Sequence, residues 1–281
     1  MKWNLKNIFS KPKNYVEVEK EEEKPKNYVE SDYGLKPPSK WSSLKPIEFS
    51  NIKKVNFPVD RYYQIETPKN QIVLHHTVSG KGSSGDIGTW INDKRRIATS
   101  LIIEHSGNVY QCFQSKYWAH HLGINSTFLK DIGFKDFNDR NVILNKKSIG
   151  IEIDSWGGLI LGDGTKMNFS GKIVNTIKGK YYAAYGNIVD VPVIHYPNGF
   201  RGYYYFEKYT DEQIWSLGEL LLILNKKYNI PLDYNNDMWD ISNNALSGVP
   251  GIWSHTSYVY KSDAHPQPEL IEMLKYLKNL V

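Results

Sequence analysis

The stretch GIWSHTSYVYKSDAHP, residues 251–266, sets His255 eight positions before Asp263. A second stretch, IVLHHT at residues 72–77, has the apolar run of a short strand and delivers His75 at its end. Two imidazoles and one carboxylate are the ligands that a catalytic zinc needs if its fourth position stays open for water. The two stretches are far apart in the chain, so only folding can bring them together.

Three motifs together resemble those of the zinc-dependent N-acetylmuramoyl-L-alanine amidases. That family includes phage endolysins and bacterial autolysins, and it is related to the peptidoglycan recognition proteins. The match spans roughly residues 51–268, and its motifs are Leu74-His75-His76-Thr77, Ser148-Ile-Gly-Ile-Glu152-Ile-Asp154, and His255 with Lys261 and Asp263. Each motif is short, but their order and their places at predicted strand ends make the resemblance fairly specific.

The resemblance implies that His75, His255 and Asp263 bind Zn²⁺. It places the metal on the first histidine of the pair, and successive strand residues point to opposite faces, so we expect His76 to pack or hydrogen-bond behind the site. Asp263 stands where some relatives carry a cysteine, and a carboxylate also binds zinc. Zinc held by three protein ligands lowers the pKa of its water to ~7 and polarises a carbonyl.

The catalytic roles implied by the resemblance fall to Glu152 and Lys261. Alternation along 148–153 places Glu152 on the face opposite the isoleucines, where its carboxylate can act as general base. The Lys261 ammonium lies two positions before Asp263 and can stabilise an oxyanion. A surface glutamate and a solvated loop lysine are the structural alternatives for these two residues.

Substrate contacts are expected from three further residues. His121 lies in WAHHLG, residues 118–123, which resembles the Trp-His-Ala-Gly loop of the family. Thr99 or Ser100 falls where some relatives have a catalytic tyrosine, which leaves more of the proton transfer to the glutamate. Trp156 follows the catalytic strand and can line the groove, although a capped turn also explains its position.

Residues 1–48 are expected to form a flexible charged tail, and residues 49–281 the amidase domain. The tail contains KPKNYVE twice, at 11–17 and 24–30, around a charged run with few aliphatic residues. Such a composition does not offset the entropy of ordering, which favours a solvated linker. A duplicated peptide that docks on a partner or on wall polymer is the alternative, because two copies raise the effective concentration.

The domain is predicted to have an α/β fold, with a mixed central sheet flanked by helices. Strands are expected at 71–75, 99–104, 109–113 and 148–153, and helices at 86–93, from Thr210 to before Ile230, and from Pro268 toward the C-terminus. Thr210 with Gln213 forms a capping box, and the leucines after it form one apolar stripe.

Residues of about 159–208 form an apparent insertion into the family pattern. They consist of short aromatic-rich segments joined by glycine turns, such as Tyr181-Tyr182 and Tyr203-Tyr204-Tyr205. Such segments predict β-structure. The insertion is expected either to form one wall of the substrate groove or to be a hairpin packed on the sheet.

Composition excludes several classes of protein. Cys112 is the single cysteine, so an internal disulfide framework is impossible, and its place in a predicted strand favours a packing role. No window approaches the ~18 apolar residues needed to span a membrane. Residues 1–10 lack a useful apolar core, so cleavable-signal secretion is not expected. The net charge of +5 is modest and is consistent with ordinary solubility.

The resemblance implies a peptidoglycan hydrolase that cleaves the amide between N-acetylmuramic acid and L-alanine of the stem peptide. The expected cofactor is Zn²⁺ and the expected partner is peptidoglycan, with no nucleic acid, no membrane insertion and a monomeric state. A phage endolysin in the host cytoplasm before its release to the wall, or a virion-associated lysin, suits the start of the sequence. A non-catalytic peptidoglycan-binding module and a virion structural protein that retains the fold are the alternatives.

Overall fold

The computed structural model describes residues 39–281, so the duplicated KPKNYVE motif lies outside the described residues. The described residues include folded structure before the expected tail boundary at residue 48. A 3-10 helix at Lys40–Ser43 brings Trp41, which is 1% exposed, into the main core, and Leu44 is buried in the same cluster. Two apolar side chains in a polar stretch gave no periodic signal, which explains the difference.

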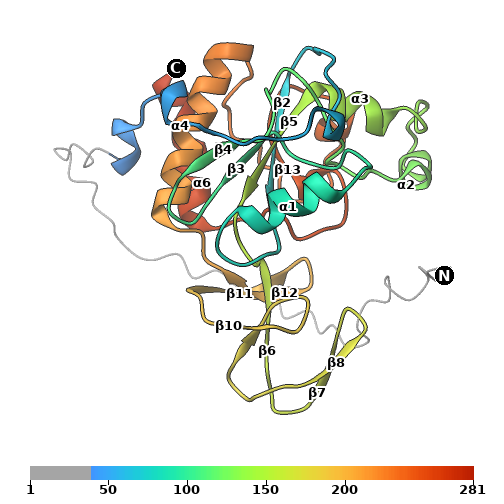
Figure 1. The fold of residues 1–281 in the computed structure, drawn as a ribbon, viewed down its shortest axis with the longest axis vertical. Coiled ribbons are helices and arrows are strands. Elements are labelled where there is room, and N and C mark those ends of the chain that lie inside the picture. Colours follow the sequence, from blue (N-terminus) through green and yellow to red (C-terminus); the bar gives the residue numbers. More distant parts are fainter. Residues whose placement is uncertain (1–38) are drawn as a thin grey trace, which may run out of the picture. The chain divides into compact units, whose positions relative to one another are not determined.

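The described residues contain a six-stranded sheet in the order β1-β4-β3-β5-β2-β13 (Figure 1). Strands β3, β5, β2 and β13 run parallel to one another, whereas β4 is antiparallel to β3 and parallel to β1. The sheet is therefore mixed, as the sequence predicts. Its strands are β1 (Lys53–Lys54), β2 (Gln71–His76), β3 (Leu101–Ile103), β4 (Val109–Gln111), β5 (Ser148–Ile153) and β13 (Gly251–Ser254).

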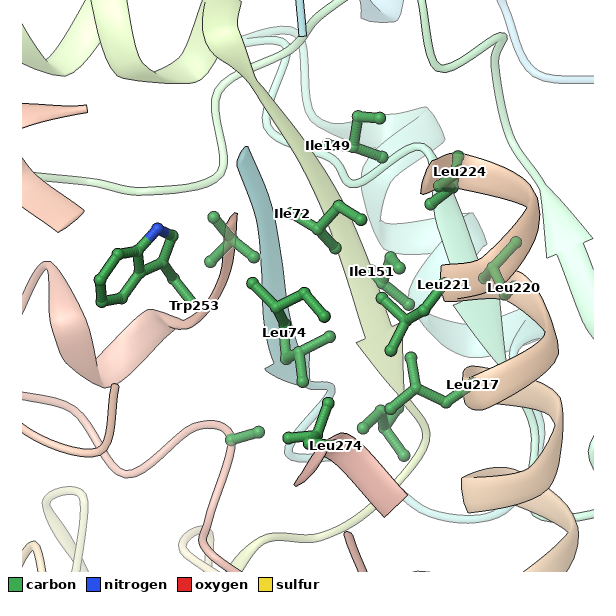
Figure 2. Close-up of a cluster of buried hydrophobic side chains, with 14 of the residues drawn as sticks. Ile72, Leu74, Ile149, Ile151, Leu217, Leu220, Leu221, Leu224, Trp253 and Leu274 are labelled. Atoms are coloured by element: carbon green, nitrogen blue, oxygen red, sulfur yellow. The ribbon is translucent and has the colours of Figure 1, made fainter. Parts of the chain in front are cut away.

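One face of this sheet packs against two helices, α4 (Asp211–Tyr228) and α6 (Pro268–Tyr276). Figure 2 shows Leu74 and Ile151 directed toward Leu217 and Leu221 of α4. Fully burying each such side chain stabilises the fold by about 1.5–3 kcal/mol. The alternation of β2 and β5 therefore assigns one face to the core and leaves the other face free for polar residues.

The predicted start and end of helix α4 are confirmed. Thr210 accepts a hydrogen bond from the backbone of Gln213, whose side chain in turn accepts from the backbone of Thr210. Asn229 ends the helix in the left-handed conformation, just before Ile230 and Pro231. The predicted hairpin is also present, because β3 and β4 pair antiparallel around the turn at Gly107.

The opposite face of the sheet carries a smaller apolar cluster that includes Ile102 and Cys112, with α1 (Ser84–Asn92) packed on it through Ile87. Cys112 is buried and free, in agreement with a packing role. Sequence reasoning did not predict the three remaining helices, which are short: α2 (Ser126–Asp131), α3 (Arg140–Lys147) and α5 (Asn243–Ser247). Within residues 39–281, no helix is long and apolar enough to span a bilayer.

The aromatic-rich insertion forms a second, antiparallel sheet in the order β10-β9-β6-β12-β11, with a separate β7-β8 hairpin. In Figure 1 these strands extend below the six-stranded sheet. Tyr203 packs where a side chain at Gly158 would collide with its ring. The strands are β6 (Gly158–Leu161), β7 (Lys166–Phe169), β8 (Lys172–Asn175), β9 (Tyr181–Tyr182), β10 (Ile188–Val189), β11 (Val193–Phe200) and β12 (Tyr203–Glu207).

A buried ion cluster joins the insertion to the main sheet. His105, in the β3-β4 turn, contacts Asp154 at the end of β5 through Nδ1 at 3.0 Å and Glu207 of β12 through Nε2 at 2.8 Å. Both carboxylates are fully buried. Burial alone would lower the pKa of His105, but the hydrogen bonds that its ring donates to the two carboxylates outweigh burial and raise the pKa to about 9. The imidazolium therefore bridges the two sheets at neutral pH.

This bridge predicts a pH-dependent stability. A raised histidine pKa contributes stability that is fully present below about pH 6.5 and is lost as the pH rises through about 9. We expect His105→Gln to lower the free energy of unfolding by roughly 1–2 kcal/mol at pH 6, and the difference from wild type to shrink toward pH 9.5. Urea unfolding at both pH values measures it, and a difference that stays constant with pH contradicts the charged bridge.

Candidate functional site

The polar residues of the motifs meet at the carboxyl ends of three adjacent parallel strands. His75 of β2 lies beside Glu152 of β5. His255 follows directly after β13, whose last residue, Ser254, pairs with Leu74 of β2. Because neighbours in register point to the same side, His75 and Glu152 share the face opposite α4. The Ser254 hydroxyl donates to the carbonyl of Ala264 at 3.1 Å, which holds the following loop against the end of β13.

This loop returns Asp263 to the two histidines. Asp263 Oδ2 lies 2.8 Å from His255 Nδ1 and 3.5 Å from His75 Nδ1. One ligand atom from each of the three residues lies within 4.8 Å of the other two, and all three residues are buried. The structure thus brings together the three residues that the sequence assigned as ligands, through Nδ1 of both imidazoles.

The electrostatics of the cluster favour a neutral His75 beside an ionised Asp263. Burial, followed by the nearby His255, lowers the pKa of His75 to about 3. Burial would raise the pKa of Asp263, but His255 and His75 outweigh it and hold that pKa well below its usual value. Neutral histidine and ionised aspartate are the forms that bind a metal.

The donor set fits zinc. Bonds of about 2.0–2.2 Å in a tetrahedral site bring ligand atoms to roughly 3.3–3.5 Å from one another. The 3.5 Å between His75 Nδ1 and Asp263 Oδ2 matches this spacing, whereas the 2.8 Å between His255 Nδ1 and Asp263 Oδ2 is shorter. Two imidazoles and one carboxylate leave one tetrahedral position for water or substrate. His75, His255 and Asp263 could therefore hold a catalytic metal ion.

The three residues line a cleft with a volume of about 490 Å³. Glu152 and the exposed Lys261 line the same cleft, as do Thr99 and His121. One side-chain oxygen of Glu152, Oε2, is buried without a hydrogen-bond partner. Burial and, next, the Asp263 carboxylate raise the pKa of Glu152 well above its usual value, while Lys261 acts in the opposite direction.

His76 and Trp156 both lie outside the cluster of His75, His255 and Asp263. His76 lies within hydrogen-bonding distance, 3.3 Å, of the Tyr209 hydroxyl, and Gly157 leaves room for its ring. This agrees with packing behind the ligand histidine. Trp156 does not line the cleft: its ring packs against Gly80 and the apolar cluster of the insertion. Strand β5 ends at Ile153, so the alternation of the strand does not predict the direction of the Trp156 side chain.

The insertion supplies cleft residues that the sequence did not single out. Tyr185, Arg201 and Tyr203 line the cleft, together with Tyr260 from the loop after β13. Arg201 donates to Asp240 at 2.7 Å and lies over the Tyr260 ring at 4.5 Å. The insertion therefore forms part of the cleft wall. Its density of tyrosines was the available signal, but it did not indicate which ring faces the cleft.

Comparison with known proteins identifies the family of this chain. A family model described as N-acetylmuramoyl-L-alanine amidase matches residues 66–268, most of the chain. The chain belongs to the N-acetylmuramoyl-L-alanine amidase family. The matched range includes every motif residue of the cleft, from His75 to Asp263. No curated protein sequence matches the chain.

Several solved structures resemble the amidase chain. PlyL is 12% identical, with a TM-score of 0.41 over 80% of this chain and 96% of that one. The endolysin LysCS from Clostridium intestinale is 15% identical, with a TM-score of 0.39 over 81% and 95%. An AmpD derivative is 13% identical, with a TM-score of 0.40 over 82% and 98%. At these scores the likeness is partial, and the family assignment depends on the family model.

The adjacent histidines of β2 give a matched test of the ligand assignment. We expect His75→Ala to weaken zinc binding by more than about 100-fold, since it removes a ligand, and His76→Ala to leave the affinity within a few-fold of wild type. Competition with a chromogenic chelator measures both affinities, and thermal unfolding shows whether each variant is folded. Equal losses in two folded variants would mean that His76 also binds the metal.

Proposed function

We propose that this amidase is a zinc-dependent peptidoglycan hydrolase that cleaves the amide between the lactyl group of N-acetylmuramic acid and L-alanine of the stem peptide. The observation that carries the proposal is the convergence of His75, His255 and Asp263 on one point in a cleft that Glu152 and Lys261 also line. Membership of the amidase family supports the choice of bond.

In this proposal His75, His255 and Asp263 hold Zn²⁺. When bound, the ion activates a water molecule and polarises the scissile carbonyl. Glu152 accepts the proton of the attacking water and delivers it to the departing nitrogen of L-alanine. Its buried position and raised pKa suit a group that must both take and return a proton.

Lys261 is proposed to stabilise the negative charge that develops on the carbonyl oxygen. Its ammonium is exposed in the cleft and faces the same groups whose pKa values it influences, Glu152 and His75. A positive charge fixed near the oxygen contributes most in the transition state, because the charge on the oxygen is largest there.

The remaining cleft residues suit a glycan-linked peptide. Thr99 and His121 lie on the side of the central sheet, whereas Tyr185 and Tyr203 line the cleft from the insertion. Tyr185 is 57% exposed, so its ring is available to pack on a sugar or a peptide. We propose that peptidoglycan strands lie between these two sides, reached after release from a host cytoplasm or from a virion.

The reaction products identify the bond that the enzyme cleaves. Digestion of purified peptidoglycan is expected to release stem peptides with a free L-alanine amino terminus, identified by mass spectrometry. Chelation of zinc should abolish the release, and added zinc should restore it. Shortened stem peptides would instead mean that another peptide bond is cut. Binding to peptidoglycan with no product would identify a non-catalytic binding module.

The two catalytic roles are separable by mutation. We expect Glu152→Gln to lower kcat by about 10²–10⁴-fold and Lys261→Met by about 10²–10³-fold, with zinc still bound in both variants. Lys178→Met, in the β8-β9 turn and not among the cleft-lining residues, is the matched control for loss of a lysine. A Glu152→Gln variant with wild-type kcat would transfer the role of general base to another group.

A further inference from the structure

Two consecutive residues, His121 and Leu122, contact both ligand histidines on the side away from Asp263. His75 Nε2 lies 3.0 Å from His121 Nδ1. His255 Nε2 lies 2.8 Å from the backbone oxygen of Leu122. The ring nitrogens that do not face Asp263 are thus both engaged by one short loop.

The direction of the first contact follows from a chain of hydrogen bonds that ends on a carbonyl. The Ser148 hydroxyl has one proton and donates it to the backbone oxygen of Leu144 at 2.7 Å. Ser148 Oγ must therefore accept from His121 Nε2, which lies 2.8 Å away. A neutral His121 with its proton on Nε2 has a lone pair on Nδ1. His75 Nε2 then donates to that lone pair, and His75 Nδ1 is left free of a proton.

The second contact has only one possible direction. The carbonyl oxygen of Leu122 can only accept, so His255 Nε2 donates to it. This orients the ring so that the other nitrogen, Nδ1, faces Asp263 Oδ2 at 2.8 Å. Both histidines in this way present Nδ1 toward Asp263, as the atom that could bind a metal.

The loop that contains His121 and Leu122 is itself hydrogen-bonded to α3. Asn145 Oδ1 accepts hydrogen bonds from the backbone amides of His121 at 2.7 Å and Leu122 at 3.2 Å. Asn145 is fully buried, and its Nδ2 donates to the backbone oxygen of Asn141 at 2.6 Å. Gly150 of β5 leaves the necessary space, since a Cβ there would lie 3.1 Å from His121 Nδ1.

We propose that His121 is a positioning residue of the metal site, which orients His75 as an Nδ1 ligand through the chain His121–Ser148–Leu144. The inference rests on the proposed zinc site. It assigns His121 a role beyond the substrate contact expected from the sequence, because the ring nitrogens of His121 are occupied by His75 and Ser148. Partners of this kind fix the ring orientation of a metal ligand and raise its basicity.

The zinc affinity of two matched variants tests the role. His121→Leu removes the acceptor but keeps an apolar side chain of moderate size, and we expect zinc affinity to fall about 10–100-fold. His121→Asn places a carbonyl oxygen near the former Nδ1, and we expect it to recover most of that loss. Equal affinities of wild type and folded His121→Leu would overturn the proposal, as would a His121→Asn variant no better than His121→Leu.

His120→Ala is the control for loss of a neighbouring histidine. His120 lies next in the chain but faces the Tyr63 hydroxyl at 3.4 Å, outside this chain of hydrogen bonds. Zinc affinity of this variant is expected to match wild type. A loss as large as that of His121→Leu would mean that general disturbance of the loop, and not the acceptor, governs the affinity.

A second readout needs neither zinc nor activity. Two-bond ¹H–¹⁵N spectra of the metal-free protein are expected to show His75 and His121 as neutral tautomers protonated on Nε2. Ser148→Ala removes the acceptor that sets His121, so mixed tautomers are expected for His121 and His75 while His255 is unchanged. Protonation of His75 on Nδ1 in wild type would overturn the proposal.

These measurements separate the inference from the proposed function. A wild-type protein that binds zinc but releases no L-alanine-terminated stems refutes the proposed activity and leaves the role of His121 intact. An active enzyme whose His121→Leu variant binds zinc normally refutes the role of His121 and leaves the activity intact.

Discussion

The parallel register of β13, β2 and β5 is the constraint on which the site depends. It sets His255, His75 and Glu152 side by side at the carboxyl ends of adjacent strands. A shift of one residue in β2 would turn His75 toward the core and Leu74 toward the cleft. The apolar contacts of Leu74 with α4 therefore also fix the position of His75, the proposed metal ligand.

Much of the fold could be predicted because its signals are local. The capping box at Thr210, the leucine stripe of α4 and the alternation of β5 each fall within one element, and each is confirmed. The early start of the folded part was missed, because Trp41 is buried by contacts with distant residues that leave no pattern around it. The short helices α2 and α3 were missed for a related reason: they are too short to show a periodic apolar face.

The candidate site divides in the same way. The proposed ligand set came from strand ends and from the family resemblance, and the structure places His75, His255 and Asp263 together. The network around them was not predictable, because it depends on backbone atoms. The side chains of Leu122 and Leu144 do not reveal these contacts, yet their backbone oxygens accept hydrogen bonds from His255 and Ser148. The inward or outward direction of Trp156 was equally inaccessible, since it follows a turn.

Burial of the polar cluster lowers the stability of the fold, and apolar packing on the opposite face of the sheet offsets this loss. Burying His75 without charge and Glu152 with an unpartnered oxygen is unfavourable, and such groups persist only where packing holds them. The leucines of α4 supply that packing from the other side of the same strands (Figure 2). A bound cation would remove part of the cost, because it would replace the close contact of Asp263 with two imidazoles by three metal bonds. Metal binding and the stability of the central strands are therefore expected to be coupled through β2.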